Sequence, residues 1–345
     1  MKEIRAAVIG VGAFGRHHAR IYHELREEGV RLVGLVDVDP VGPGEVARRL
    51  GVPLVACVGD LPEPVDVVSV AVPTVDHRKV AEPLLLRGIH CLVEKPIAGS
   101  TLDARALVNA AERGGAVLQV GLVERFNPVM AALDRLGDRP VFFEVHRLAP
   151  FSFRAADVGV VMDMMIHDLD ILNHLVGEEA EHVDAVGVPI ISSHEDIANA
   201  RITFPSGCVA NVTASRVSLQ KMRRIRIFSP EAYLSLDYDR REALLVRRAS
   251  CLKDWMARGG PGRCVAPDPV PSFQEMLETE KLPIHDAEPL REEISALVAA
   301  VRNGRRPSVG GNEGLRALRL AERILAEIRT RPVPGTVGTP SPTPG

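Results

Sequence analysis

The stretch from Asp157 to Asp170, DVGVVMDMMIHDLD, holds the side chains best suited to chemistry. Asp163 and His167 stand four positions apart, so in a helix they share one face, which Asp170 and His174 extend. A carboxylate on that face can orient an imidazole for proton transfer, or both can bind a metal. An amphipathic surface helix with its polar side in water has the same pattern. The elements that surround this helix must therefore decide its role.

A glycine-rich turn near the N-terminus predicts a phosphate site. The strand pattern IRAAVIG leads into Gly10-Val11-Gly12-Ala13-Phe14-Gly15 and then into a helical stretch. Gly10 would allow a tight turn, Gly12 a close approach to a pyrophosphate, and Gly15 the packing of helix on strand. The phosphates would meet the helix N-terminus, with Ala13 and Phe14 beside them. A structural glycine turn in an unrelated α/β protein is the alternative.

The next strand pattern, RLVGLVDVD, carries the predicted ribose contact. It includes Asp37, which follows the last glycine of the turn by about twenty positions, the usual spacing for a ribose-binding acid. A carboxylate there accepts hydrogen bonds from the adenosine ribose and repels a 2′-phosphate. The pattern therefore predicts NAD rather than NADP.

Strand and helix patterns alternate from here to Gly121. VDVVSVAVPT, IHCLVEKP and AVLQVG are strands, separated by helices at about 76–87 and 100–113. The alternation predicts an α/β fold with a doubly wound parallel sheet, whose ligands bind beyond the carboxyl ends of the strands. Most lysines are solvated surface charges, but Lys95 would lie at such an end. The residues predicted at this cofactor cleft are Pro73, Thr74, His77, Glu94 and Lys95.

Composition excludes several classes of function. The 345 residues are 46% hydrophobic, enough for two domains, and 42 basic against 45 acidic residues give a net charge of −3. We therefore expect no nucleic-acid partner and no membrane binding. Five cysteines without a CxxC pair favour neither a disulfide framework nor a cysteine zinc site, so we expect a cytoplasmic protein.

Taken together, these motifs resemble the oxidoreductase family named after glucose-fructose oxidoreductase, inositol dehydrogenase and a rhizopine-catabolism protein (Gfo/Idh/MocA). The resemblance rests on AVIGVGAFGRHHAR, VAVPTVDH, EKP, ERFNP, DMMIHDLD and the C-terminal EPLREEISALVAAVRNGRRPSVGGNEGLRAL. It implies that Lys95, Asp163 and His167 line the active site and that the Lys95–Pro96 bond is cis. The family often has two glycines shortly before that aspartate, whereas this chain has only Gly159.

The resemblance also implies the domain organisation. An NAD-binding Rossmann domain would span 1–124, with C-terminal helices within 286–330 packing back on it. An α+β domain would span 125–285, with helices, including one from about Met162 to Val176, on a large open, mainly antiparallel sheet. The free face of that sheet would form a homodimer or homotetramer interface. Residues 331–345 are expected to be disordered, and 257–271 to form a long exposed loop.

The chemistry implied is oxidation of a secondary alcohol on a sugar, with hydride passing to NAD. His167, with a pKa near the working pH, would take the hydroxyl proton, and Asp163 would orient the imidazole. Lys95 would stabilise the developing alkoxide. A metal bound by Asp163, His167 and His174 is the competing arrangement, but hydride transfer beside a lysine needs none, so none is predicted.

The substrate prediction is a UDP-sugar. HRLAPFSFRAADVGVVMDMMIHDLDILNHLVG and the segments after it look like the branch that oxidises UDP-N-acetylglucosamine to its 3-keto form for lipid A or related glycan precursors. A diphosphate would require convergent arginines, although solvated or interface arginines are the alternative. The run Lys221, Arg223, Arg224 and Arg226 is interpreted as a solvated strand face or subunit contact. The predicted substrate contacts are Arg125, Asn127, Arg147, Arg154 and Arg216.

Two other functions remain open. One is a dehydrogenase for inositol, a free sugar or another UDP-sugar. The other is a non-catalytic dinucleotide-binding regulator, because a fold does not fix a function. The complete set of Lys95, Asp163 and His167 argues against the regulator.

Overall fold

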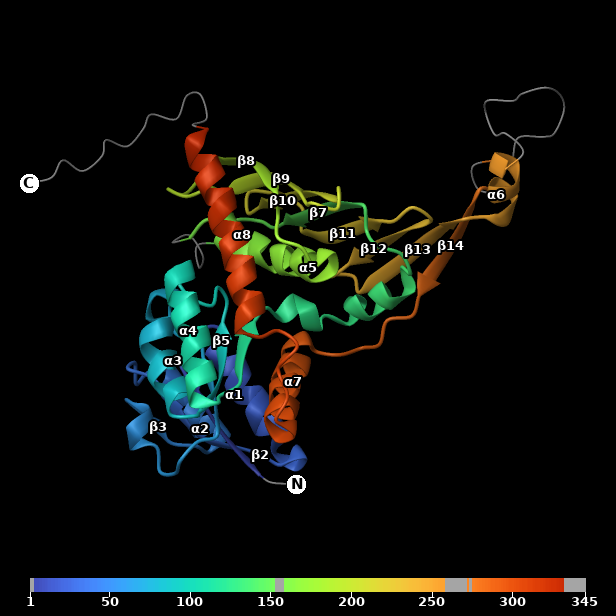
Figure 1. The fold of residues 1–345 in the computed structure, drawn as a ribbon. Helices are drawn as coiled ribbons and strands as arrows, with labels where there is room; N and C mark the ends of the chain where they lie inside the picture. The colour runs from blue at the N-terminus through green and yellow to red at the C-terminus, as the bar shows by residue number, and fades with distance from the viewer. Residues whose placement is uncertain (1–2, 153–157, 258–271, 273–274, 332–345) are drawn as a thin grey trace, which may run out of the picture.

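The first third of the chain winds around a six-stranded sheet (Figure 1). The computed structural model describes residues 3–152, 158–257, 272 and 275–331. All neighbouring strand pairs in this sheet are parallel, in the order β3-β2-β1-β4-β5-β6, which confirms the predicted doubly wound sheet. The strands are β1 (Ile4–Ile9), β2 (Val30–Val36), β3 (Leu54–Val55), β4 (Val67–Val70), β5 (His90–Glu94) and β6 (Leu118–Gly121).

Helices connect these strands. Ser100 caps α4 by accepting a hydrogen bond from the N–H of Asp103, as its capping sequence predicts. The strands β1 and β4 are almost wholly buried because apolar side chains point to both faces and helices cover both. The helices are α1 (Gly15–Glu24), α2 (Gly42–Leu50), α3 (His77–Leu86) and α4 (Thr101–Gly114).

An eight-stranded sheet is formed by the following part of the chain, in the order β14-β13-β12-β11-β7-β10-β9-β8. β7 and β10 run parallel and the other neighbouring pairs run antiparallel, which confirms the mainly antiparallel sheet. Its strands are β7 (Phe142–Leu148), β8 (His182–Val188), β9 (Ile197–Thr203), β10 (Val209–Ser215), β11 (Met222–Phe228), β12 (Ala232–Asp237), β13 (Glu242–Arg248) and β14 (Leu277–Leu282).

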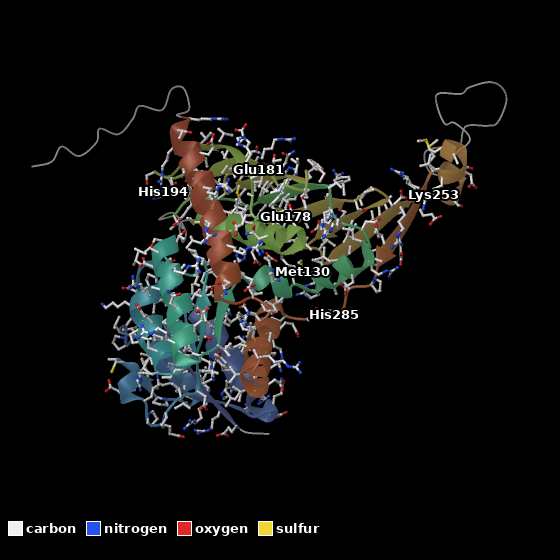
Figure 2. All side chains as sticks on the ribbon, viewed as in Figure 1. Met130, Glu178, Glu181, His194, Lys253 and His285 are labelled. Atoms are coloured by element: carbon white, nitrogen blue, oxygen red, sulfur yellow. The ribbon has the colours of Figure 1, made fainter. Side chains whose placement is uncertain are left out.

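One face of this sheet is covered. A π-helical turn, Val161–Met165, leads into α5 (Ile166–Val176), which lies against the sheet together with the 3-10 segment Pro128–Arg135 (Figure 1). Eight consecutive residues of α5, from Ile166 to Asn173, are buried. The interpretation as an ordinary surface helix is therefore wrong, because the polar side of this helix is also covered. A short helix, α6 (Ser250–Ala257), carries Lys253 at the far end of the sheet (Figure 2).

The last two described helices return to the part of the chain around the first sheet, and the second of them also packs on the part around the second sheet. α7 (Pro289–Asn303) packs against α1, while α8 (Gly311–Thr330) runs along α4 and β6 and then along α5 and β8 (Figure 1). Leu315 and Leu318 of α8 belong to the core of the first sheet, whereas Leu320 and Ile324 belong to that of the second. Arg316 and Arg323 donate to the backbone carbonyls of Glu178 and Glu181, which lie beside α8 (Figure 2).

The described part of the chain lacks two kinds of feature, a helix that could span a membrane and a cluster of metal-binding side chains. No helix there is long and apolar enough to cross a membrane. No three His, Cys, Asp or Glu side chains there gather closely enough to hold a metal ion. Residues 258–271 of the predicted loop, and the predicted tail from 332 onward, lie outside the described residues.

Candidate active site

The glycine turn borders a cleft at the carboxyl ends of β1, β2 and β4. Gly10 has φ +82°, and a Cβ there would lie 2.7 Å from the carbonyl oxygen of Ala71. A Cβ on Gly15 would lie 1.8 Å from the carbonyl oxygen of Gly10, whereas one on Gly12 would meet nothing within 4 Å. The turn is thus closed on the protein side and open at Gly12. The cavity, about 440 Å³, is lined among others by Gly10, Gly12, Asp37, Val72 and Pro73.

This cleft fits the dinucleotide that the sequence predicts. Phe14 is exposed at the turn, and α1 begins immediately after it, so the helix N-terminus faces the open side. Asp37 accepts the N–H of Val11 at 2.6 Å through one carboxylate oxygen and the N–H of Asp39 at 2.9 Å through the other. Each oxygen keeps a lone pair for a ribose hydroxyl.

Two of the predicted cofactor residues make hydrogen bonds within the protein. Both ring nitrogens of His77 lie 3.0 Å from backbone carbonyls, those of Pro96 and Val72, so this buried side chain braces two loops beside the cleft. One carboxylate oxygen of Glu94 bonds to Nε2 of His18 at 2.9 Å, and the other accepts the N–H of Lys95 at 3.2 Å. Contact of either residue with a cofactor stays a prediction.

Lys95, at the carboxyl ends of the strands of the first sheet, makes hydrogen bonds to the part of the chain that packs on the second sheet. It follows β5, and its bond to Pro96 is cis, as predicted. Its Nζ donates to the Oδ1 and to the backbone carbonyl of Asp163, each at 2.7 Å. Asp163 belongs to the π-helical turn, a wider coil that shifts the hydrogen-bond ladder and is frequent at functional sites. The turn therefore presents two acceptors of one residue to the lysine.

His167 is the titratable group beside this pair. Burial lowers the pKa of its imidazole well below the ordinary value, and the positive charges of Lys95, Arg147 and Arg223 lower it further. The prediction that this pKa lies near the working pH is therefore wrong, and the ring is neutral at pH 7. Its Nδ1 is buried and has no hydrogen-bond partner in the described part of the chain. The Asp163 carboxylate bonds to Lys95, not to the imidazole as predicted.

Buried ion pairs lie next to His167. Arg147 donates to both carboxylate oxygens of Asp168, at 2.7 and 2.8 Å, and to Glu124 at 2.7 Å. Arg125 pairs with Asp170 at 3.2 Å. Burial raises the pKa of Asp170 to about 6, against the opposing charge of Arg125.

Comparison with known proteins agrees with this architecture. Residues 4–122 match the model of an oxidoreductase family with an NAD-binding Rossmann fold, and residues 136–235 match the GFO/IDH/MocA C-terminal domain. The UDP-N-acetylglucosamine 3-dehydrogenase of Acidithiobacillus ferrooxidans is 40% identical over 239 residues, which cover 69% of this chain and 75% of the relative. The chain belongs to the Gfo/Idh/MocA oxidoreductase family.

Other members of the family are similar to this protein over nearly the whole chain. A solved structure of the same A. ferrooxidans enzyme superposes with a TM-score of 0.84 at 33% identity, over 96% of this chain and 99% of that one. Inositol 2-dehydrogenase of Rhizobium meliloti is 25% identical over 94% of this chain and 97% of its own. Like these Gfo/Idh/MocA dehydrogenases, the protein is an NAD-dependent oxidoreductase that acts on a CH–OH group.

The structure places the predicted substrate residues of this Gfo/Idh/MocA member in different surroundings. Arg125 and Arg147 are in the buried pairs described above, and Arg216 donates to Asp196 at 2.7 Å and to the carbonyl of Val158 at 2.6 Å. The side chain of Asn127 accepts the N–H of Val129 and donates to Glu124. Arg154 lies outside the described residues. Whether these residues contact the substrate stays a prediction. Their ion pairs and hydrogen bonds within the protein give those that the structure describes a structural role as well.

Near the site, one residue is absent from the predictions and another lies in different surroundings from those predicted. His18, on α1, holds Glu94 and also lies 3.1 Å from Ser69, so it fixes the strand end that carries Lys95. Its only sequence signal is its position three residues after Gly15, on the helix face that packs on the sheet. His174, placed on the face of Asp163 and His167, is exposed, whereas His167 is buried earlier in the same helix, so the burial of this face ends before His174.

Proposed function

We propose that the protein oxidises a secondary hydroxyl of a sugar nucleotide with NAD. Within that class, UDP-N-acetylglucosamine, oxidised at its 3-hydroxyl as a precursor step for lipid A or a related glycan, is the best supported substrate. The observation that carries the chemistry is the Lys95–Asp163 pair beside a buried, neutral His167. Support for the substrate comes from the 40% identity to a UDP-N-acetylglucosamine 3-dehydrogenase.

The side chains divide the reaction between them. NAD, when bound, supplies the carbon that accepts the hydride. Nε2 of neutral His167 takes the proton of the substrate hydroxyl, and this base is worth roughly 100- to 10,000-fold in rate. Lys95 donates a hydrogen bond to the same oxygen, and its positive charge stabilises the alkoxide that develops there. Asp163 holds Nζ of Lys95 in place.

The low pKa of His167 has a mechanistic consequence. Burial is the main cause of the lowered pKa, and the positive charge of Lys95 lowers it further, so the ammonium group that polarises the alcohol also helps to keep the base unprotonated. The imidazole of His167 is a weaker base than an ordinary imidazole, but it is unprotonated at neutral pH and can therefore accept a proton. Lys95 offsets this weakness, because it also makes the alcohol a stronger acid.

Assembly is part of the same proposal. We expect a homodimer or homotetramer formed through the face of the second sheet opposite α5. That face has a hollow lined by alternating side chains of β7, β9 and β10, including Glu144, His146, Asn199, Arg201 and Thr213. Light scattering coupled to size-exclusion chromatography measures the subunit number, and a monomer at micromolar concentration would contradict this expectation.

NADH absorbance tests the function directly. Purified protein is mixed with NAD and UDP-N-acetylglucosamine, with free N-acetylglucosamine and myo-inositol in parallel and a carbonyl trap to draw the reaction forward. We expect NADH from the UDP-sugar alone. NADH from inositol or the free sugar would keep the mechanism and discard the substrate, a result that the inositol dehydrogenase relatives make informative. No NADH from any of the three, together with bound NAD, would favour the regulator.

A further inference from the structure

Arg223 lies on the covered face of the second sheet, near the active site. Along β11, Ile225 and Ile227 are buried against the helices, and side chains two apart share a face, so Arg223 points the same way. Arg224 and Arg226 point to the other face, where they pair with Asp237 and Glu144. Arg223 therefore does not share a strand face with Arg224 and Arg226.

Arg223 reaches the charged groups beside His167. Its register partner on β7 is Arg147, directly opposite, which is an unfavourable arrangement for two like charges. Oε1 of Glu124 accepts from Nη1 of both arginines, at 2.7 Å from Arg147 and 3.2 Å from Arg223. The charge of Arg223 also lowers the pKa of His167. The guanidinium is thus part of the active-site electrostatics.

Arg223 is held more loosely than its neighbour. Its side chain is 39% exposed, against 4% for Arg147. Each of its carboxylate partners has a closer cation: Glu124 has Arg147, and Asp239 has Lys221 at 2.7 Å, compared with 3.8 Å to Arg223. Turning Arg223 toward a ligand would therefore leave buried Glu124 paired with Arg147. Asp239, whose side chain is 22% exposed, can be hydrated when Lys221 turns as well.

We propose that Arg223, with Lys221 two positions earlier, binds the diphosphate of a nucleotide sugar whose ring lies against Lys95 and His167. The inference rests on the proposed function and identifies its specificity-determining residue. A guanidinium offers parallel N–H donors that match phosphate oxygens, and an ammonium adds a point charge. Both side chains are partly exposed, at 39% and 55%, so a ligand can reach them.

Binding of UDP to the NAD-loaded protein tests this assignment by calorimetry, with uridine as the probe that lacks phosphate. Arg223→Gln should weaken UDP binding about tenfold or more, since a hydrogen-bonded charge is lost, and leave uridine binding unchanged. Arg247→Gln is the matched control. Arg247 is 41% exposed, pairs with Glu280 at 3.6 Å and lies on β13, so its loss should leave both affinities unchanged.

Turnover separates this inference from the proposed function. NADH formation by the wild type from UDP-N-acetylglucosamine supports the function whatever Arg223 does. Wild-type turnover with equal UDP affinity and equal KM in Arg223→Gln would overturn the inference alone. An absence of turnover with any UDP-sugar would overturn both. If Arg223→Gln fails to fold, Lys221→Gln carries the same test, and unchanged UDP affinity in that exposed variant would count against the site.

Discussion

Replacing Asp168 with Asn should destabilise the protein far more than removing a solvent-exposed carboxylate that is also paired with an arginine. Asp168 accepts two hydrogen bonds from Arg147, at 2.7 and 2.8 Å, and both side chains are almost wholly buried. The matched control is Glu280→Gln, which breaks the 3.0 Å pair with Arg135 away from the proposed subunit interface. That pair is 46% exposed at the carboxylate and 48% at the guanidinium.

The two expected losses of stability differ because one ion pair is buried and the other is in contact with water. Removing one partner of a buried ion pair typically costs about 3–5 kcal/mol, because the remaining charge has lost its counter-ion in a dry interior. Asn keeps one acceptor and Glu124 still faces Arg147, so we expect about 3 kcal/mol for Asp168→Asn. The exposed pair should contribute about 0–1 kcal/mol. Typical total stabilities are about 5–15 kcal/mol, so the first loss is a large fraction.

Urea unfolding followed by circular dichroism measures both losses. A double-mutant cycle with Arg147→Met separates the coupling between the two side chains from the cost of each substitution. Because Asp168 adjoins His167, we also expect kcat to fall in Asp168→Asn, whereas Glu280→Gln should leave it unchanged. Equal destabilisation of about 1 kcal/mol or less in the two variants would refute the reasoning, since burial would then have no effect on the pair.

Further predictions concern the base, the lysine and the cofactor cleft. The acid limb of the kcat/KM profile should lie below pH 6.5, because activity is lost only when falling pH protonates His167 through its lowered pKa; a midpoint at or above 6.5 would contradict this. Lys95→Met should reduce kcat about 100-fold or more by steady-state assay, and a loss smaller than about tenfold would remove the lysine from the mechanism. Gly12→Val should leave the melting temperature nearly unchanged but raise the NADH dissociation constant measured by fluorescence, whereas Gly15→Ala, with its 1.8 Å clash, should lower the melting temperature. Asp37→Ala should relax the preference for NAD over NADP, and an unchanged ratio of the two kcat/KM values would argue against its ribose role.

The parts of the site that local sequence encodes were predictable. The glycine turn depends on a strand, a tight turn and a helix that are consecutive in the chain, and the structure has all three with Gly10 at positive φ. The order of strands and helices likewise predicted a doubly wound sheet, because short crossovers in such sheets follow one handedness. Lys95 at the end of β5 follows from the same alternation.

Features that depend on long-range pairing were not predictable. The partner of Asp163 is Lys95, 68 positions away, and no local pattern identifies it. Whether Arg147 and Arg223 share a face depends on the register of β7 with β11, and a shift of one residue would reverse it. The π-turn also has no periodic signature, since the apolar spacing around Met165 fits an ordinary helix equally well.

The position of α8 determines when the active site can assemble during synthesis. Its first half completes the core that carries Lys95, and its second half completes the core that carries His167. A nascent chain that has not yet released residues 311–330 from the ribosome has both sheets but lacks the helix that joins their cores. Pairing of Lys95 with Asp163 is therefore expected only after α8 has left the ribosome, and release of α8 should be the step that switches on activity.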